Sequence, residues 1–201
     1  MANIWIYIIC GAIAYILGSI SFSAIFARKF KNEDITKVGS GNAGTTNMLR
    51  TYGWKMGLLT LLCDAAKGVA ATLIAYFIAG DLAMYIAAVC AVGGHTWSCF
   101  MKFKGGKGIA TTTGVLLVIL PIQTIIVFGS CVGLVFLTKI MSIGSIVGVI
   151  ASAVVPLIMY PENTALHVCM FIICGFALWA HRANIVRLVQ GKENKLSRKK
   201  K

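Results

Sequence analysis

The sequence predicts an all-α, polytopic integral membrane protein with about seven transmembrane helices. Of its 201 residues, 58% are hydrophobic and only 12% are charged, whereas soluble domains are about half apolar and a quarter charged. The mean hydropathy is +0.84. Long apolar runs alternate with short loops that carry most of the lysines and arginines, as membrane topology requires. We expect residues 1–201 to form a single domain that ends in a basic, partly disordered tail, residues 192–201.

Six apolar runs define the expected crossings, because a helix needs about 20 apolar residues to span a bilayer. They are Ile4–Ala27, Gly57–Ala79, Leu82–Phe100, Ile109–Leu137, Met141–Tyr160 and Ala165–Ala180. The first run has no basic region before it and is too long for a signal peptide, so we expect it to be retained as a helix. The fourth run is too long for one comfortable crossing and short for two.

The positive-inside rule decides how often the fourth run crosses. The loop at residues 28–55 is rich in lysine and arginine, so it is taken as cytoplasmic, which places the Gly80–Asp81 connection outside and residues 102–107 inside. One crossing by the fourth run would put Lys139 and the basic tail outside, against the rule. Two crossings with a turn near Pro121 keep the cations on the cytoplasmic side. We therefore expect seven helices, with the N-terminus outside and the C-terminus inside.

The first of two glycine-rich basic segments is Gly39–Asn47, which reads Gly-Ser-Gly-Asn-Ala-Gly-Thr-Thr-Asn and is followed by Arg50. It matches G-x-G-x-x-G, but no strand precedes it and no βαβ unit follows, which argues against a dinucleotide fold. Successive amides of a glycine turn form a concave site for an anion. Ser40 and Thr45 add hydrogen-bonding side chains. The alternative is a tight loop that caps a helix, with Arg50 facing lipid head groups.

The second segment runs from Gly93 through His95 to Gly108, and in it two lysines, Lys104 and Lys107, flank a pair of glycines. This arrangement suits a phosphate group. It resembles a Walker A loop, but Gly108 stands where serine or threonine is required and Met101 where the first glycine is required, so we do not expect ATP hydrolysis. The alternatives are a flexible positive-inside loop and, for His95, a hydrogen-bonded structural histidine.

The third segment leaves the last apolar run at His181. If the helix continues, His181, Asn184 and Leu188 share one face, where an imidazole and an amide could bind one ligand. Asp64 and Lys67 are three residues apart inside an apolar run, and charges within a membrane are usually paired or functional. We expect a structural ion pair that supports the site, and a transporter's proton relay is the alternative.

Several function classes fit the sequence poorly. The net charge of +13 lies in loops between apolar runs, which argues against nucleic-acid binding. No histidine is followed by aspartate five residues later, so the signature of CoA-dependent glycerolipid acyltransferases is missing. No paired carboxylates suit metal-assisted phosphoryl transfer. A transporter of organic anions would place polar groups deep in the membrane, whereas these motifs cluster at one face, and a scaffold would need none of them.

Together the segments resemble the bacterial membrane acyltransferases that transfer fatty acyl groups from acyl phosphate to glycerol 3-phosphate. The likeness covers almost the whole chain and rests on Gly-Ser-Gly-Asn-x-Gly-x-Thr-Asn with Arg50, Gly94-His95 with Phe103–Gly108, Asp64-x-x-Lys67-Gly68, and His181-x-x-Asn184-x-x-Arg187. The chain departs from the family pattern at Ser98, usually proline, and at Ala180, usually basic. Both positions are at helix ends, so these departures concern local geometry more than chemistry.

The resemblance implies transfer to the sn-1 hydroxyl, which yields 1-acylglycerol 3-phosphate (lysophosphatidic acid) and phosphate for phospholipid biosynthesis, without a metal, CoA or another cofactor. It implies a multi-pass protein of the bacterial cell membrane with a cytoplasmic active site. The expected partners are acyl phosphate, glycerol 3-phosphate, the lipid bilayer and, transiently, the enzyme that produces acyl phosphate. The catalytic residues carried over are Ser40, Arg50, Lys107, His181 and Asn184. The expected substrate-binding residues are Gly39, Gly41, Asn42, Gly44, Thr45, Asn47, His95, Lys104, Gly105, Gly106 and Gly108.

The residues fit this chemistry. An acyl phosphate is already activated, so the enzyme mainly has to bind, orient and neutralise charge, and orientation alone can lower a barrier by about 7–11 kcal/mol. No carboxylate in the motifs is an evident general base. We expect the donor's phosphate to take the hydroxyl proton while His181 positions the acceptor or shares the proton.

Overall fold

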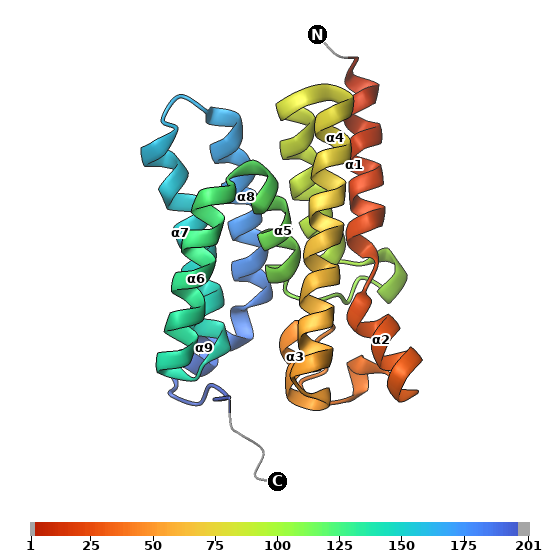
Figure 1. Ribbon diagram of the computed structural model, residues 1–201, viewed down its shortest axis with the longest axis vertical. Helices are drawn as coiled ribbons and strands as arrows, with labels where there is room; N and C mark the ends of the chain where they lie inside the picture. The colour runs from red at the N-terminus through yellow and green to blue at the C-terminus, as the bar shows by residue number, and fades with distance from the viewer. Residues whose placement is uncertain (1–2, 197–201) are drawn as a thin grey trace.

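The computed structural model describes residues 3–196, a bundle of α-helices joined by short loops (Figure 1). The α-helices are α1 (Ile4–Ser19), α2 (Phe22–Lys31), α3 (Thr45–Tyr52), α4 (Trp54–Thr96), α5 (Ile109–Ile119), α6 (Pro121–Thr138), α7 (Met141–Met159), α8 (Thr164–Ala180) and α9 (Arg182–Val189). Two short 3₁₀ helices, Ile35–Lys37 and Cys99–Met101, lie in the loops. Of the expected tail, residues 192–196 are non-helical chain, and the part from 197 to 201 lies outside the described residues.

Helix α4 is a hairpin of two antiparallel arms. Ala79 (φ −147°, ψ 23°) and Gly80 (φ 72°, ψ −160°) leave the helical region, and glycine adopts such a positive φ without steric cost. Asp64 and His95 stand at nearly equal distances along the chain from Gly80, and their side chains lie 3.7 Å apart from Oδ1 to Nδ1. The second arm therefore returns along the first (Figure 1). The break lies where a connection between two crossings is predicted.

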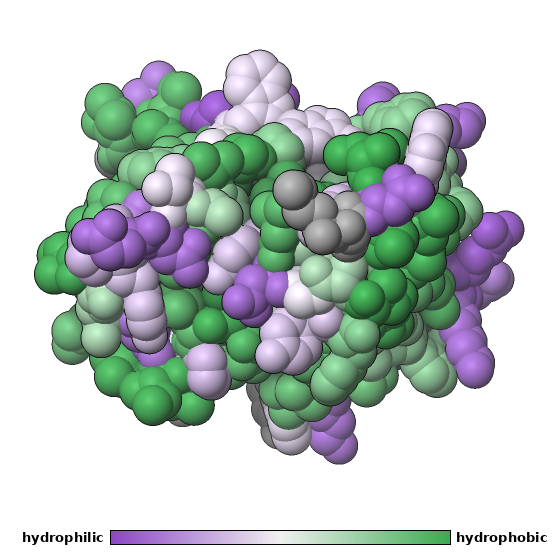
Figure 2. Space-filling view, turned by 90° about the horizontal axis from the view of Figure 1, so that it is seen from above, coloured by the Kyte–Doolittle hydropathy of each residue, from purple (hydrophilic) through white to green (hydrophobic). Residues whose placement is uncertain are grey.

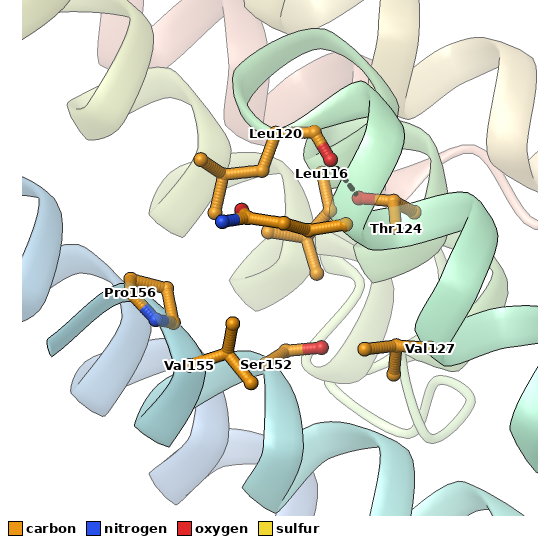
Figure 3. Close-up of a pocket in the computed structure, with 8 residues that line it drawn as sticks. Leu116, Leu120, Thr124, Val127, Ser152, Val155 and Pro156 are labelled. Atoms are coloured by element: carbon orange, nitrogen blue, oxygen red, sulfur yellow. Dashed lines mark hydrogen bonds between the residues drawn. The ribbon is translucent and has the colours of Figure 1, made fainter. Parts of the chain in front are cut away.

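The fourth apolar run divides near Pro121 as predicted. Helix α5 ends at Ile119, Leu120 is non-helical (φ −140°, ψ 65°), and α6 begins with Pro121 in its first turn, where a missing N–H costs no helical hydrogen bond. Thr124 Oγ1 donates to the Leu120 carbonyl over 2.7 Å. Figure 3 shows this break beside a cavity of about 10 Å³ that faces α7, room for no more than one water molecule.

The first apolar run is interrupted, whereas a continuous segment from Ile4 to Ala27 is predicted. Helix α1 ends at Ser19, and Ile20 is extended (φ −64°, ψ 115°). Ser21 then begins a new helix, because its Oγ accepts the Ala24 N–H over 3.3 Å and so caps α2. The end of the apolar run therefore belongs to α2, a short helix with basic residues in its last turn.

The outer surface of the bundle is strongly apolar. Phe77, Ile122, Leu137 and Ile158 are each more than 70% exposed, and Figure 2 shows apolar side chains around much of the outline. Soluble monomers rarely expose large apolar patches. In the described part of the chain, four helical stretches are long and apolar enough to cross a membrane, or five if the bent α8–α9 pair is one span. The protein is an all-helical, multi-pass integral membrane protein.

Helix α4 is the centre of the bundle and contacts α1, α5 and α8. Glycines allow the backbones of α4 and α5 to approach closely, as small residues do in membrane helix pairs. A Cβ on Gly68 would lie 2.6 Å from the Thr111 carbonyl oxygen, and one on Gly114 would collide with the Ala65 carbonyl. This tight contact fixes the N-terminal end of α5 relative to α4, close to the glycine-rich segments.

Candidate active site

Asn47 shapes the first glycine loop from within. It is 2% exposed, its Nδ2 donates to the Val38 carbonyl over 3.0 Å, and its Oδ1 accepts the Ser40 N–H over 2.9 Å. Gly39 (φ 60°) and Gly41 (φ 69°) supply the left-handed backbone that the turn needs. Because the polar atoms of Asn47 are bonded within the loop, this residue positions Ser40, whose side chain is exposed.

The loop ends at the N-terminus of α3. This helix has no side-chain cap, because its N-cap residue is Gly44. The first amides of a helix lack internal partners and attract anions. Thr45 Oγ1, in this first turn, and Arg50 Nε, in the last turn of α3, are both buried, and neither has a hydrogen-bond partner in the described part of the chain. Arg50 Nη2 donates to the Asn194 carbonyl over 3.0 Å. Helix α3 thus presents donors from both its first and its last turn.

The second glycine turn folds onto the end of α4. The Gly105 N–H donates to the Thr96 carbonyl over 3.1 Å, and the Gly106 N–H to the His95 carbonyl over 3.0 Å. These two amides are therefore already paired inside the protein. Across residues 3–196 the amides of Lys107 and Gly108 make no such bond, and they lead into α5, whose N-terminus also lacks a side-chain cap.

The two glycine-rich segments touch each other. A Cβ on Gly106 would lie 2.6 Å from the Ala43 carbonyl oxygen, so only glycine fits there. Lys104 is exposed on the outer side of the turn, whereas Lys107 points into the protein, where its Nζ donates to Asn184 Oδ1. The uncapped beginnings of α3 and α5 therefore lie on the same side of the bundle, with Lys107 between them and α9.

Glu193, which lies in none of the three sequence motifs, completes the cluster. It is 9% exposed, Asn184 Nδ2 donates to its Oε1 over 2.9 Å, and Arg187 Nε donates to its Oε2 over 3.0 Å. Residues 192–196 thus fold back over α9 instead of leaving it. An available signal was that Glu193 is the only acidic residue after Glu162 in a stretch rich in cations.

The cluster carries a surplus of positive charge. Burial lowers the pKa of Lys107 to about 8; Glu193 opposes this shift, and Arg187 and Arg50 add to it. Arg187 pairs with Glu193, Arg50 binds the carbonyl of the next residue, Asn194, and Lys107 shares Asn184 with Glu193, so the three cations lie around residues 193–194. A partly desolvated group of this kind suits anionic ligands, and phosphate in particular.

His181 lies at a bend between α8 and α9. The helix does not continue straight through His181, because α8 and α9 differ in direction by 62°, but His181 is the N-cap of α9, the helix that holds Asn184 and Leu188. Both His181 and Asn184 are nevertheless buried at the bend. His181 Nδ1 lies 2.8 Å from the Ala177 carbonyl oxygen, which can only accept, so Nδ1 carries the proton and Nε2 is left as an acceptor.

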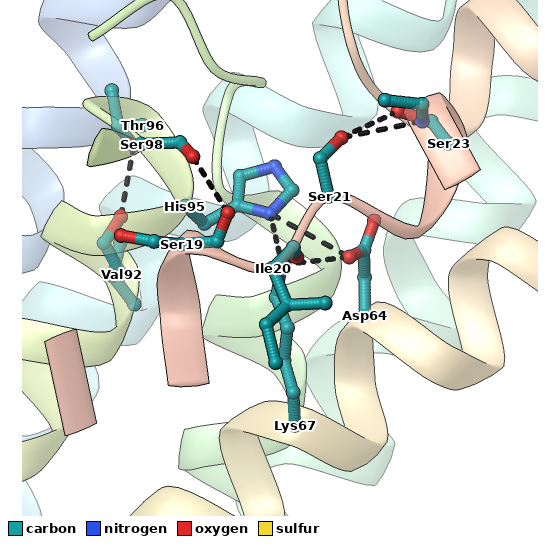
Figure 4. Close-up of polar contacts among 11 residues, drawn as sticks. Ser19, Ile20, Ser21, Ser23, Asp64, Lys67, Val92, His95, Thr96 and Ser98 are labelled. Atoms are coloured by element: carbon teal, nitrogen blue, oxygen red, sulfur yellow. Dashed lines mark hydrogen bonds and ion pairs between the residues drawn. The ribbon is translucent and has the colours of Figure 1, made fainter. Parts of the chain in front are cut away.

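The predicted ion pair between Asp64 and Lys67 is confirmed, with 2.8 Å from Oδ1 to Nζ. It lies inside the bundle (Figure 4), and the structure adds a third member, His95, whose Nδ1 is 2.9 Å from Lys67 Nζ. His95 is 5% exposed and lies beneath the second glycine turn. The structure therefore brings Arg50, Lys107, His181 and Asn184 into one region and places His95 below it.

The profile of a protein family described as glycerol-3-phosphate acyltransferase matches residues 8–191. The chain belongs to this family. The glycerol-3-phosphate acyltransferase of Clostridioides difficile strain 630 is 42% identical over 98% of this chain and 99% of its own length. The corresponding protein of Thermoanaerobacter sp. strain X514 is 38% identical, with 96% of each chain covered.

Solved structures agree with the family assignment. The crystal structure of PlsY (YgiH), an integral membrane glycerol 3-phosphate acyltransferase, in its glycerol 3-phosphate form has a TM-score of 0.89 and 32% identity, and the match covers 95% of this chain and 96% of that one. The lysophosphatidic acid form has a TM-score of 0.87 and 31% identity, with 95% of each chain covered. The family indicated by the sequence motifs is thus confirmed.

Proposed function

We propose that the protein transfers a fatty acyl group from acyl phosphate to the sn-1 hydroxyl of glycerol 3-phosphate, forming lysophosphatidic acid and phosphate. Family membership supports the acyltransferase activity. The two PlsY crystal structures, described as the glycerol 3-phosphate form and the lysophosphatidic acid form, support this acceptor and this product. The observation that carries the proposal is the partly buried cation cluster of Arg50, Lys107 and Arg187 near the uncapped N-termini of α3 and α5. Such a cluster suits a reaction that brings two phosphorylated substrates together.

The cluster offsets the repulsion between those substrates. Arg50 and the first amides of α3 bind one phosphate, and Lys107 with the first amides of α5 binds the other. Neutralising both phosphates allows the acyl carbon to approach the acceptor hydroxyl, and donors aimed at the developing oxyanion lower the barrier further. Ser40 contributes its hydroxyl from the rim of the first loop, and Asn184 holds Lys107 in place through its Oδ1.

His181 positions the acceptor. With Nδ1 bonded to the Ala177 carbonyl, its Nε2 accepts a hydrogen bond from the sn-1 hydroxyl. As the hydroxyl oxygen bonds to the acyl carbon, the bond from that carbon to the phosphate oxygen breaks. The hydroxyl proton then leaves its hydrogen bond with Nε2 and passes to the departing phosphate, and His181 stays neutral. Atoms and charge balance without a metal, CoA or another cofactor. Binding and orientation account for most of the catalysis, because the donor is already activated.

The proposed topology has seven crossings, formed by α1, the two arms of α4, α5, α6, α7 and α8. The N-terminus lies outside, and the glycine-rich loops, α9 and the C-terminus lie inside the cell. The distribution of lysine and arginine supports this orientation. In a bacterial cell membrane the site then faces the cytoplasm, where glycerol 3-phosphate enters from water and the acyl chain from the bilayer. Transient contact with the enzyme that makes acyl phosphate would take place on the same side. The whole chain acts as one domain.

The donor is tested with the protein purified in detergent, glycerol 3-phosphate, and either palmitoyl phosphate or palmitoyl-CoA. We expect lysophosphatidic acid and equimolar phosphate with palmitoyl phosphate, and no product with palmitoyl-CoA. Turnover only with palmitoyl-CoA would support glycerol 3-phosphate as the acyl acceptor and would contradict acyl phosphate as the acyl donor. Folded protein that turns over neither donor would favour an anion transporter, whose activity requires a sealed vesicle.

The pH dependence of kcat/KM should follow the protonation state of Lys107. Its ammonium binds phosphate only when protonated, and its pKa is lowered to about 8. We therefore expect kcat/KM to be constant below about pH 7, to be halved near pH 8 and to fall about tenfold per pH unit well above that. A bound phosphate favours the charged form, so the fall in kcat should begin at higher pH. Lys107→Arg, which stays charged, should remove the decline. A kcat/KM profile that is flat to pH 9.5 in the wild-type protein would contradict this role.

A further inference from the structure

Asp64, Lys67 and His95 form a buried cluster to which the proposed reaction assigns no role. Their side chains are 1%, 5% and 5% exposed, and they come from both arms of α4. Lys67 Nζ contacts Asp64 Oδ1 at 2.8 Å and His95 Nδ1 at 2.9 Å, and it also donates to the Ile20 carbonyl. Figure 4 shows Lys67 at the centre of these contacts. The cluster therefore joins the break after α1 to both arms of α4.

Lys67 fixes the tautomer of His95. An ammonium group has only donors, so Nδ1 of His95 must accept the hydrogen bond from Lys67. The proton of the neutral imidazole is then on Nε2. Asp64 is the counter-ion that accompanies the Lys67 charge into the bundle. The identity of all three side chains thus determines which nitrogen of His95 carries a hydrogen.

His95 Nε2 faces the junction of the two glycine-rich segments. A Cβ on Gly106 would collide with Nε2 and lie 2.6 Å from the Ala43 carbonyl oxygen. The backbone of His95 binds the same turn, because its carbonyl accepts the Gly106 N–H over 3.0 Å. The His95 main chain therefore bonds the turn while its ring packs against Gly106, and the residue after Gly106 is Lys107.

We propose that His95 is a positioning residue, held as the Nε2–H tautomer by Lys67, that fixes the second glycine turn and so the direction of Lys107 and the first amides of α5. It acts through the turn without touching substrate, which differs from the substrate contact expected from the sequence. This inference rests on the proposed function, because it assigns a role within that phosphate site. Its specific consequence is an effect on substrate affinity that depends on one ring nitrogen.

Two substitutions at His95 separate the ring nitrogens. The amide of His95→Gln reaches the position of Nε2 and can present an N–H to the turn, whereas that of His95→Asn reaches only the position of Nδ1. We expect His95→Asn to raise the KM of one phosphorylated substrate about tenfold or more, with kcat little changed, as is typical for supporting groups around a site. His95→Gln should restore KM to within about threefold of the wild-type value.

A purely structural role predicts a different result. Both variants would then lower the thermal unfolding temperature and the active fraction, and KM for both substrates would stay at the wild-type value. That outcome, or equal KM values in the two variants, would overturn the inference. The wild-type chain is assayed in parallel: no turnover by the wild type would overturn the proposed function itself, whereas wild-type turnover with unaltered KM in the variants would overturn only the role of His95.

A second pair of substitutions tests Lys67 without leaving a buried charge unpaired, which is strongly destabilising. Asp64→Asn with Lys67→Met removes both charges together and also the donor to His95. We expect the same KM to rise as in His95→Asn, and no further rise when the three substitutions are combined. Leu62→Ala, on the lipid-facing side of the same arm and 57% exposed, is the control and should leave KM unchanged. A wild-type KM in the double variant would contradict the tautomer role of Lys67; if it does not fold, the His95 pair decides.

Discussion

Replacing Lys107 by methionine is expected to lower kcat/KM about 10²–10³-fold, the usual cost of removing one donor from a preorganised anion site. Methionine preserves the length of the apolar stem and removes only the charge. Lys107 is the cation at the start of α5, and its Nζ contacts Asn184 Oδ1, so its loss also frees the amide that bonds Glu193. Steady-state release of phosphate from palmitoyl phosphate measures the effect.

Lys102→Met is the matched control, because Lys102 belongs to the same loop but is exposed. Its loss removes the same formal charge from the loop, and we expect a change in kcat/KM of less than about twofold, since exposed charges are well screened. Equal losses in the two variants would show that the net charge of the loop matters, and not the position of Lys107. A wild-type rate in Lys107→Met would exclude the cluster as the phosphate site.

Replacing His181 by alanine is expected to lower kcat about 10²–10⁴-fold, the range for a group that acts on the transferred proton or its oxygen. Nδ1–H donates to the Ala177 carbonyl. Nε2 of the imidazole can therefore accept a hydrogen bond from the sn-1 hydroxyl of glycerol 3-phosphate. Loss of the ring removes the partner that orients this hydroxyl. Single-turnover rates separate the effect on chemistry from any effect on binding.

His181→Gln distinguishes positioning from proton abstraction. The carboxamide oxygen can accept a hydrogen bond near the position of Nε2, but it cannot act as a base at neutral pH. If the donor's phosphate takes the proton, the rate of His181→Gln should be at least about tenfold higher than that of His181→Ala. A glutamine variant as slow as the alanine variant would contradict the positioning role and assign the proton to the imidazole.

Most of the helical arrangement can be predicted because local chemistry determines its breaks. Gly80 permits a positive φ that other residues rarely adopt, and Pro121 fits the first turn of a new helix. The positive-inside rule then favours a second crossing after Pro121. In contrast, the break after Ser19 is marked by no proline and by no glycine of positive φ, because Gly18 is still part of α1. It depends on Lys67, a residue of another helix that binds the Ile20 carbonyl.

The site, like the fold, can be predicted where it depends on local sequence and cannot where it depends on tertiary contacts. Each motif is visible in the sequence because glycine, lysine and histidine at those spacings suit an anion. Hydrogen bonds that depend on folding are not visible, so nothing in the sequence indicates that the Gly105 and Gly106 amides are occupied by carbonyls of α4. The burial of Glu193 depends on a chain reversal after α9, and the position of His95 depends on the hairpin that brings Asp64 beside it.

The most direct test of the central claim is a structure of this protein with glycerol 3-phosphate bound. The partly buried cation cluster predicts phosphate oxygens at about 3 Å from the nitrogen atoms of Arg50 or Lys107, beside the N-terminus of α3 or α5, with the sn-1 hydroxyl directed at His181 Nε2. Phosphate bound elsewhere, with Lys107 still paired to Asn184 and Arg50 to the Asn194 carbonyl, would contradict the claim that this cluster is the site of acyl transfer.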